Sequence, residues 1–403
     1  MARLLYGNFD FEHELATEHY NRPKRLARLN AELTCSLIPL ATADEVICWP
    51  LPLPDETLDS FSIPGLPDTR FVGVDDLKSI TATSALVLEP WGWSQAAVKF
   101  AQKYGIETPH IDINAARTAN SRGFSSQLEH SLGVALPGAC RLGSSRQLVS
   151  AIADSAGRWS QAVDDHRVVL KAEFGMSGRE RLTLRGDEAL TPSVHGWINR
   201  RVEQNGAVYL EPWLECVAEF SAHWNIQAPA NDACDAQIQF IGWTQLLNSQ
   251  SGQYVGSRVS DSAQTGPRSV DPSLLTQIAE TAKRAAMAVA QLGYHGPLGI
   301  DSMVYQDAVG EHRVRPLQDI NARWSMGRIA LALQSQLASG RCLTMLRIPA
   351  TTSIESDDDV SIIRLTPESV NGQPCTEVLV ALFSDNAESV LAVEQTLLDQ
   401  RTS

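Results

Sequence analysis

The sequence has few of the features that mark membrane, nucleic-acid-binding or disulfide-bonded proteins. No segment reaches about 18 uncharged apolar residues, the length that a membrane-spanning helix needs. The N-terminus carries acidic residues where a signal peptide needs an apolar run, so we expect a cytoplasmic protein. The net charge is -14, so acidic residues outnumber basic ones. The chain therefore has no excess of basic surface with which to bind nucleic acid or an acidic membrane. An anionic ligand therefore needs a local basic pocket.

Several common catalytic and cofactor motifs are also missing. The seven cysteines are scattered and include no CxxC pair, so neither a zinc site nor a disulfide framework is indicated. The N-terminal part lacks a GxGxxG motif, so dinucleotide binding is only weakly supported. The sequence also shows no Ser-His-Asp or Cys-His constellation. Its chemistry, if it has any, relies on positioning and on charge.

At 403 residues the chain is long enough for two or three domains. Up to about residue 115, short apolar runs alternate with helical stretches. Val46–Trp49 and Ala85–Leu88 are predicted to be buried strands, and a helix is predicted from Ser94 to Tyr104, ended by Gly105. This alternation indicates a small α/β domain with a largely parallel sheet at residues 1–115.

The pattern then changes to strands and helices in mixed order. We predict a larger domain at 116–345, with lobes at about 120–210 and 211–345, followed by a linker and C-terminal extension at 346–403. In the extension, Val360–Leu365 and Glu377–Phe383 are predicted to pair as a hairpin covered by a helix. The predicted fold class is therefore α/β and α+β: an N-terminal α/β domain, a two-lobed unit and a small α+β extension.

Two neighbouring segments late in the larger domain carry acidic and amide side chains within apolar stretches. Asp319 and Asn321 share one face of a predicted strand because strand side chains alternate with period 2, and a hairpin brings Asp301 beside them. Carboxylate and amide oxygens are ligands that Mg²⁺ selects, and Mg²⁺ keeps positions open for substrate phosphates. Polar residues on an exposed sheet face are the alternative. We favour the metal because unpaired carboxylates beside an apolar layer are costly, with Arg323 as a nearby positive charge.

A lysine followed by a glycine-rich turn forms a second candidate. Lys171 ends a predicted apolar strand, and Gly175, Ser177 and Gly178 lie in the turn-rich segment after it. Such a lysine can reach nucleotide phosphates, while glycines let backbone N–H groups approach the phosphate oxygens. Taken alone, a lysine at a strand end before a hairpin turn is the better interpretation.

A third candidate follows the next predicted strand. Glu211, Trp213 and Leu214 lie where a proline stiffens the chain, and backbone groups of such a segment can pair with the edge of a purine. Glu219, further along, could hold the ribose hydroxyls. Taken alone, an ordinary strand exit with Trp213 packed in a core is favoured. Arg122, just before a predicted helix, is by itself a common surface arginine.

Taken in order, these segments resemble the ATP-grasp superfamily of ligases over roughly residues 120–340. The resemblance implies ATP and Mg²⁺ as cofactors, with Mn²⁺ as a substitute. Arg122 stands at the position of the first nucleotide-binding basic residue, which is usually lysine. The segment from Gly175 to Arg181 matches the flexible loop over the phosphates. By resemblance, nucleotide binding falls to Arg122, Lys171, Gly175, Ser177, Gly178, Glu211, Trp213, Leu214 and Glu219.

The same resemblance implies metal binding by Asp301, Asp319 and Asn321, although the middle residue is usually glutamate. It assigns catalysis to Arg323 and Lys171. The implied reaction activates a substrate carboxylate as an acyl phosphate, which an amine, or less often a thiol, then attacks. The expected partners are small-molecule carboxylates and amines, without nucleic acid or membrane, and a homodimer is left open.

Two other interpretations stay open at this stage. The deviations at Asp319 and Arg122 favour an ATP-binding regulatory or partner-binding module without ligase turnover. A biotin-dependent carboxylase component fits less well, because Val217–Trp224 does not match that subfamily. Ser325 and Gly327, at the start of the helix after Arg323, are further candidates for contacting the acyl phosphate. The sequence identifies neither the carboxylate nor the nucleophile.

Overall fold

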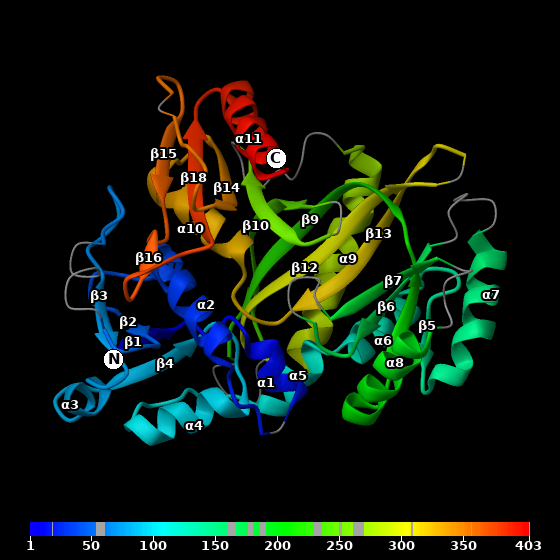
Figure 1. Ribbon diagram of the computed structural model, residues 1–403, viewed down its shortest axis with the longest axis horizontal. Helices are drawn as coiled ribbons and strands as arrows, with labels where there is room; N and C mark the ends of the chain where they lie inside the picture. Colours follow the sequence, from blue (N-terminus) through cyan, green and yellow to red (C-terminus); the bar gives the residue numbers. More distant parts are fainter. Residues whose placement is uncertain are drawn as a thin grey trace.

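The computed structural model describes residues 1–17, 19–53, 61–159, 167–175, 180–185, 191–228, 236–249, 252–260, 270–307, 309–355 and 357–402. Within these ranges the strands form three main sheets, and helices cover their faces (Figure 1). The N-terminal sheet, in blue, lies at one end of the molecule, and a small sheet that contains β5 to β8 lies at the other (Figure 1). A large sheet joins them.

The N-terminal unit is built on a parallel sheet, as the alternation of apolar runs and helices predicts. Its strand order is β3-β2-β1-β4, and the pairings within it are parallel. Successive side chains of β1 point to opposite faces, so Leu4 and Leu5 are buried in different apolar cores. The elements of this unit are β1 (Ala2–Tyr6), α1 (Phe11–Ala16), α2 (Lys24–Thr34), the 3-10 helix η1 (Cys35–Leu40), β2 (Val46–Trp49), β3 (Arg70–Gly73), α3 (Leu77–Thr81), β4 (Leu86–Pro90), α4 (Gln95–Tyr104) and α5 (Ile113–Ala119).

The small sheet is antiparallel, with strand order β5-β8-β6-β7. Helices α7 and α8 cover one of its faces, where Leu170 is part of an apolar core. Because strand side chains alternate, Val169 and Lys171 point to the opposite face. The elements are α6 (Arg122–Leu132), β5 (Cys140–Leu142), the 3-10 helix η2 (Ser145–Gln147), α7 (Leu148–Trp159), β6 (Arg167–Ala172), β7 (Arg181–Arg185), α8 (Pro192–Asn205) and β8 (Val208–Pro212).

The start of helix α6 fixes the position of Arg122. Ser121 caps the helix, because its side chain accepts a hydrogen bond from the backbone N–H of Phe124 at 3.1 Å. Gly133 ends the helix in the left-handed conformation, with φ of 71°. Arg122 is therefore the first helical residue, and its backbone N–H is held by the carbonyl of Glu173 at 2.9 Å, just beyond β6.

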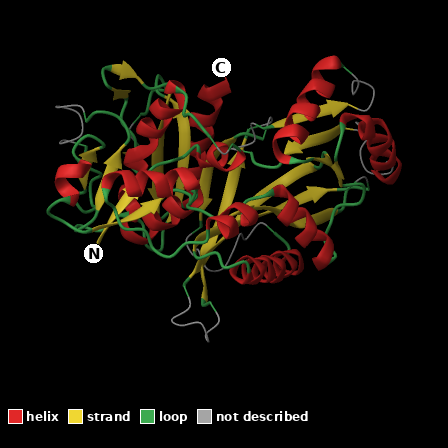
Figure 2. Ribbon diagram, turned by 90° about the horizontal axis from the view of Figure 1, so that it is seen from below, coloured by secondary structure: helices red, strands yellow, loops and turns green. Residues whose placement is uncertain are grey.

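The large sheet is antiparallel and has the strand order β13-β12-β9-β10-β11-β14-β18-β15. Figure 2 shows it in the middle of the molecule, with helices packed over the strands. The elements are β9 (Glu215–Ile226), β10 (Ile238–Asn248), β11 (Tyr254–Val259), α9 (Pro272–Gln291), β12 (Gly296–Gln306), β13 (His312–Asn321), α10 (Met326–Leu337), β14 (Cys342–Pro349), β15 (Ser361–Arg364), β16 (Ser369–Val370), β17 (Gln373–Pro374), β18 (Glu377–Ser384) and α11 (Ala387–Thr402).

The C-terminal segment continues this sheet. Strands β15 and β18 pair antiparallel, as predicted, but Asn371–Gly372 turns a separate short hairpin, β16–β17, that lies between them in sequence. Strand β18 also pairs with β14 along its whole length, so the extension shares a sheet with the preceding unit. The boundary expected at 345 falls within β14. The proposed division at 115 and 345 stays a prediction.

The fold thus belongs to the α/β and α+β class expected from the sequence, with a parallel N-terminal sheet followed by antiparallel ones. Within the described ranges, the helices are all too short or too polar to cross a lipid bilayer.

Candidate active site

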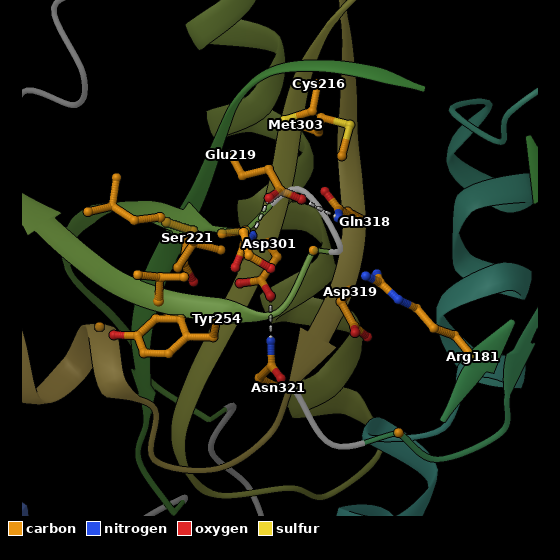
Figure 3. Close-up of a pocket in the computed structure, with 18 of the residues that line it drawn as sticks. Arg181, Cys216, Glu219, Ser221, Tyr254, Asp301, Met303, Gln318, Asp319 and Asn321 are labelled. Atoms are coloured by element: carbon orange, nitrogen blue, oxygen red, sulfur yellow. Dashed lines mark hydrogen bonds between the residues drawn. The ribbon is translucent and has the colours of Figure 1, made fainter. Parts of the chain in front are cut away.

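A cavity of about 1810 Å³ lies between the small sheet and the large sheet and reaches the N-terminal unit. Strands β6 and β8 line one wall, and β9, β12 and β13 line the other. Figure 3 shows the polar part of this cavity, where side chains from separate strands point toward one another. The volume exceeds the ~300–1,000 Å³ of a typical small-ligand pocket, so the cavity has room for a nucleotide and a second ligand.

The predicted metal ligands lie together on the strand pair β12–β13. Asp301 is directly opposite Asp319, and Asn321 lies two positions further along β13. Asn321 Nδ2 donates a hydrogen bond to Asp301 Oδ2 at 2.9 Å (Figure 3). Burial and the charge of Asp319 raise the pKa of Asp301 to about 7. The three side chains line the cavity, and we call them the metal trio.

The donor set of the metal trio fits a hard divalent cation. Two carboxylates and one amide offer oxygen ligands of the kind that Mg²⁺ selects. The raised pKa of Asp301 indicates that its charge is poorly compensated, and a divalent cation would relieve both its burial and its repulsion from Asp319. Across the described ranges, no cluster of three or more His, Cys, Asp or Glu side chains could hold a metal, so a site here depends on the amide of Asn321.

Arg122 connects the small lobe to the metal trio. Its Nη2 donates to Asp319 Oδ2 at 3.0 Å, and its Nη1 donates to the backbone carbonyl of Gln318 at 3.0 Å. The arginine is thus within reach of a ligand held by Asp319. The planar guanidinium of Arg122 donates to two acceptors at once, which fixes its orientation in a way that a lysine ammonium would not.

Arg323 lies on the other side of the trio, toward the N-terminal unit. Its Nη2 donates to Asn321 Oδ1 at 2.9 Å, and its Nε lies 2.9 Å from Glu12 Oε1. The guanidinium also lies 5.7 Å from the ring centre of Phe11 and 5.9 Å from that of Trp91. Burial raises the pKa of the Glu12 carboxyl even though Arg323 opposes this. The N-terminal unit therefore holds the predicted catalytic arginine.

Lys171 belongs to a buried charge network on the opposite wall. Its Nζ is 2.6 Å from Glu211 Oε2, and Arg315 Nη1 donates to the same oxygen at 2.7 Å. Arg315 Nη2 also donates to Glu129 Oε1 at 2.8 Å. Burial and the neighbouring Arg122 and Arg315 lower the pKa of Lys171 to about 8. The cations crowd one another, which suits this wall to an anionic ligand.

The buried carboxylate of Glu211 is therefore paired with Lys171 and Arg315 and is not an exposed hydrogen-bond acceptor for a nucleotide. Although burial opposes it, Arg315 and Lys171 hold the pKa of this carboxyl well below its ordinary value. The backbone N–H of Trp213 donates to the carbonyl of Arg167 at 2.9 Å, so the purine contact predicted for Trp213 cannot use that group. Leu214 lines the cavity beside it.

Glu219 also lines the cavity, from strand β9. It accepts a hydrogen bond from Gln318 Nε2 at 2.7 Å and another from Asn248 Nδ2 (Figure 3). Its carboxylate faces the same space as the metal trio. Its role at the ribose stays a prediction.

The glycine-rich segment is only partly described. Gly175 lines the cavity at the end of the lysine strand, whereas Ser177 and Gly178 lie outside the described residues. On the far side of this segment, Arg181 reaches into the cavity toward Asp319 (Figure 3). Its guanidinium lies 5.7 Å from the ring centre of Trp213, and burial lowers its pKa.

The start of helix α10 also lines the cavity. Ser325 caps the helix by accepting a hydrogen bond from the backbone N–H of Arg328 at 3.2 Å. A Cβ on Gly327 would lie 2.6 Å from His223 Nε2 and from Thr244 Oγ1, so this position has no room for a side chain. Burial and Arg328 lower the pKa of His223 to about 3, so the ring is neutral near pH 7. The predicted role of this terminus at an acyl phosphate is not tested.

Sequence reasoning did not find several residues of this site. Arg315 and Glu129 join the lysine wall, and Glu12 and Trp91 hold Arg323. Each of these contacts joins segments that are far apart in the chain, so no local sequence pattern predicts it. A buried-looking arginine between apolar neighbours, as at Arg315, is the one signal that could have pointed to a charge partner.

No protein-family model matches the sequence, and no curated protein matches it. Solved structures are similar over nearly the whole chain. Pyruvate carboxylase from Rhizobium etli has a TM-score of 0.59 and 14% identity, with 99% of this chain and 37% of that chain covered. Biotin carboxylase from Campylobacter jejuni, in a beta-gamma-ATP complex, has a TM-score of 0.56 and 13% identity, with 98% and 90% covered.

A third similar structure is carboxyaminoimidazole ribonucleotide synthase from Aspergillus clavatus, complexed with ATP. Its TM-score is 0.55 at 13% identity, with 99% of this chain and 98% of that chain covered. The chain therefore spans the length of this enzyme but only 37% of the pyruvate carboxylase. At such identities the likeness establishes the fold alone. Because the likeness extends over nearly the whole chain, it shows that the chain has the ATP-grasp fold.

Proposed function

We propose that the chain is an ATP- and Mg²⁺-dependent ligase that activates a substrate carboxylate as an acyl phosphate and joins it to an amine or, less often, a thiol. The observation that carries this proposal is the position of Lys171 and the metal trio on two walls of one cavity. Arg122 spans the walls, because it bonds Asp319 and is close enough to Lys171 to lower the pKa of that lysine. A triphosphate between the walls would meet cations on both sides.

The nucleotide would lie along the small lobe. In this proposal, Glu211–Leu214 forms the adenine hinge, with Leu214 in place of Trp213 as the N–H donor. Glu219 contacts the ribose from strand β9. Gly175 and Arg181 contact the phosphates, and the position of Arg181 in the cavity supports this.

The proposed reaction uses charge stabilisation and positioning. Mg²⁺ held by the metal trio would neutralise phosphate charge and orient the transferred group. Lys171 and Arg122 hold the γ-phosphate for in-line attack by the substrate carboxylate, and Arg323 stabilises the charge of the transferred phosphoryl group. The nucleophile then forms a bond to the carbonyl carbon, the bond to phosphate breaks, and phosphate leaves.

The similar structures support an ATP-dependent ligase without selecting a substrate. The biotin carboxylase and the ribonucleotide synthase have different substrates, yet each is 13% identical to this chain. The donor groups described above would serve either kind of carboxylate activation. The carboxylate and the nucleophile are therefore questions for experiment.

The test is release of ADP and phosphate from MgATP in the presence of pooled small carboxylates and amines. We expect release that requires a carboxylate, rises with an amine and falls about a hundredfold in Lys171→Met, because the phosphate loses its lysine. Lys103→Met, at an exposed lysine of α4, is the matched control and should behave as wild type. Tight MgATP binding with no release under any combination would instead favour an ATP-binding regulatory or partner-binding module.

A further inference from the structure

Glu12 is a buried carboxylate of the cavity whose hydrogen bonding is incomplete. Its side chain is 9% exposed and lines the cavity where the N-terminal unit meets it. Oε1 pairs with Arg323 Nε, but no described residue donates a hydrogen bond to the buried Oε2. A buried carboxylate oxygen without a donor is destabilising, so it points to a donor that the chain itself does not supply.

One guanidinium connects this carboxylate to the metal trio. Arg323 Nε lies 2.9 Å from Glu12 Oε1 as an ion pair, and Arg323 Nη2 donates a hydrogen bond to Asn321 Oδ1 at 2.9 Å. Glu12 is therefore one side chain away from the place where the acyl phosphate would form. It lies on the side of the N-terminal unit, whereas the proposed adenine hinge lies on the small lobe. A group bound at Glu12 would face the acyl phosphate from the side opposite the nucleotide.

The surroundings of Glu12 are apolar and aromatic. The rings of Phe9 and Trp91 are 4.7 Å apart and form part of the wall. Leu29, Leu33 and Met326 also line the cavity. A negative oxygen beside aromatic faces suits an ammonium group, which has three N–H donors and is attracted by ring faces. The leucines and the methionine suit an apolar group next to the ammonium.

We propose that Glu12 forms the ammonium subsite for the nucleophile, and that the nucleophile is a primary amine with an apolar group beside its nitrogen. This inference rests on the ligase activity proposed above. The bound ammonium gives one proton to the Glu12 carboxylate and becomes a neutral amine. Its nitrogen forms the C–N bond, the C–O bond to phosphate breaks, and phosphate leaves with the second proton of the nitrogen.

The first experiment compares a cationic with a neutral nucleophile. Wild type and Glu12→Gln receive MgATP, pooled simple organic acids as carboxylates, and either L-leucinamide or hydroxylamine, which is neutral at pH 7. We expect KM for leucinamide to rise about tenfold or more in Glu12→Gln, because a charged partner is lost, and this rise should exceed any change in KM for hydroxylamine. Glu32→Gln, at a helix α2 carboxylate paired with Arg28, is the matched control.

An equal loss with both nucleophiles in Glu12→Gln would overturn the inference, because Glu12 would then act only by orienting Arg323. Glutamine keeps an oxygen close to Arg323 Nε and removes only the charge of the ion pair, so a change in the orientation of Arg323 should affect both nucleophiles alike.

The second experiment measures binding without turnover. L-leucinamide should raise the Tm of wild type but not of Glu12→Gln, and N-acetyl-L-leucinamide, which has no ammonium, should raise neither. MgADP should raise both. If hydroxamate forms but the Tm changes do not follow this pattern, the ammonium subsite is wrong and the ligase proposal still holds. The expected Tm pattern without any hydroxamate would sink the ligase proposal and keep the subsite.

Discussion

Burial and the neighbouring Asp319 carboxylate raise the pKa of Asp301 to about 7, so a proton competes with a divalent cation at this residue near neutral pH. Metal binding needs the carboxylate form, and its affinity therefore rises with pH until Asp301 has lost its proton. From a pKa of about 7, Mn²⁺ should bind about tenfold more tightly at pH 8 than at pH 6.

Mn²⁺ binding to the nucleotide-free protein, followed by electron paramagnetic resonance, measures this directly. Asp301→Asn should bind weakly with a flat profile between the two pH values. A steep profile that survives in Asp301→Asn would show that another group controls the metal.

The network around Glu211 makes a prediction about stability. Glu211→Ala leaves both Lys171 and Arg315 without their shared carboxylate in a buried site, which should lower the free energy of unfolding by about 3–5 kcal/mol. Urea denaturation at pH 7 measures the change. Glu203→Ala, at an exposed position of helix α8, should stay within about 0.5 kcal/mol of wild type. Equal stability of the two variants would show that the network contributes no net stability.

Individual site residues differed in how far the sequence revealed them. Asp319 and Asn321 could be placed together because strand alternation is a local rule, and the register of β12–β13 does pair Asp319 with Asp301. The same register shifts between Asp301 and Met303, which breaks the regular alternation along β13. Arg315 and Gln318 therefore line the same cavity although their spacing is odd. A single sequence gives no clear signal for a β-bulge of this kind.

Two glycines in helices should respond in opposite ways to alanine. Gly196 lies inside α8, where a Cβ would meet only Arg200 Nη1 at 3.5 Å, so Gly196→Ala should stabilise the protein by about 0.5–1 kcal/mol. Gly327 lies at the start of α10, where a Cβ would be 2.6 Å from two buried side chains, so Gly327→Ala should destabilise it by about 1–3 kcal/mol.

Urea denaturation of both variants beside wild type tests this pair. A stable Gly327→Ala would mean that His223 and Thr244 can move apart at little cost. The first turn of α10 would then be less closely held than its contacts indicate.

Helices with local end signals were predicted well from the sequence. Ser94 and Gly105 cap α4 as expected, because capping depends on side chains within a few residues. The C-terminal strands were harder to place. Their pairing with each other was expected, but the pairing of β18 with β14 joins two segments that are separated by about 30 residues in the chain. Such pairing depends on the whole sheet and not on the local sequence.

At the level of the whole molecule, three units together form the cavity, so the sequence of any one unit does not predict it. The small lobe supplies Lys171, the large sheet supplies Asp301 and Asp319, and the N-terminal unit supplies Glu12 and Trp91. The order of motifs along the chain was enough to predict the first two walls. The contact between Glu12 and Arg323 was not predicted, because it joins segments that are far apart in the chain.

A crystal structure with Mg²⁺ and a non-hydrolysable ATP analogue tests the central claim most directly. We predict a metal about 2.0–2.1 Å from oxygens of Asp301, Asp319 and Asn321. We also predict that Lys171 Nζ contacts a phosphate oxygen of the same nucleotide and that the adenine lies beside Leu214. A nucleotide bound elsewhere would contradict the proposed function, and so would a nucleotide in this cavity whose metal is not bound by the metal trio.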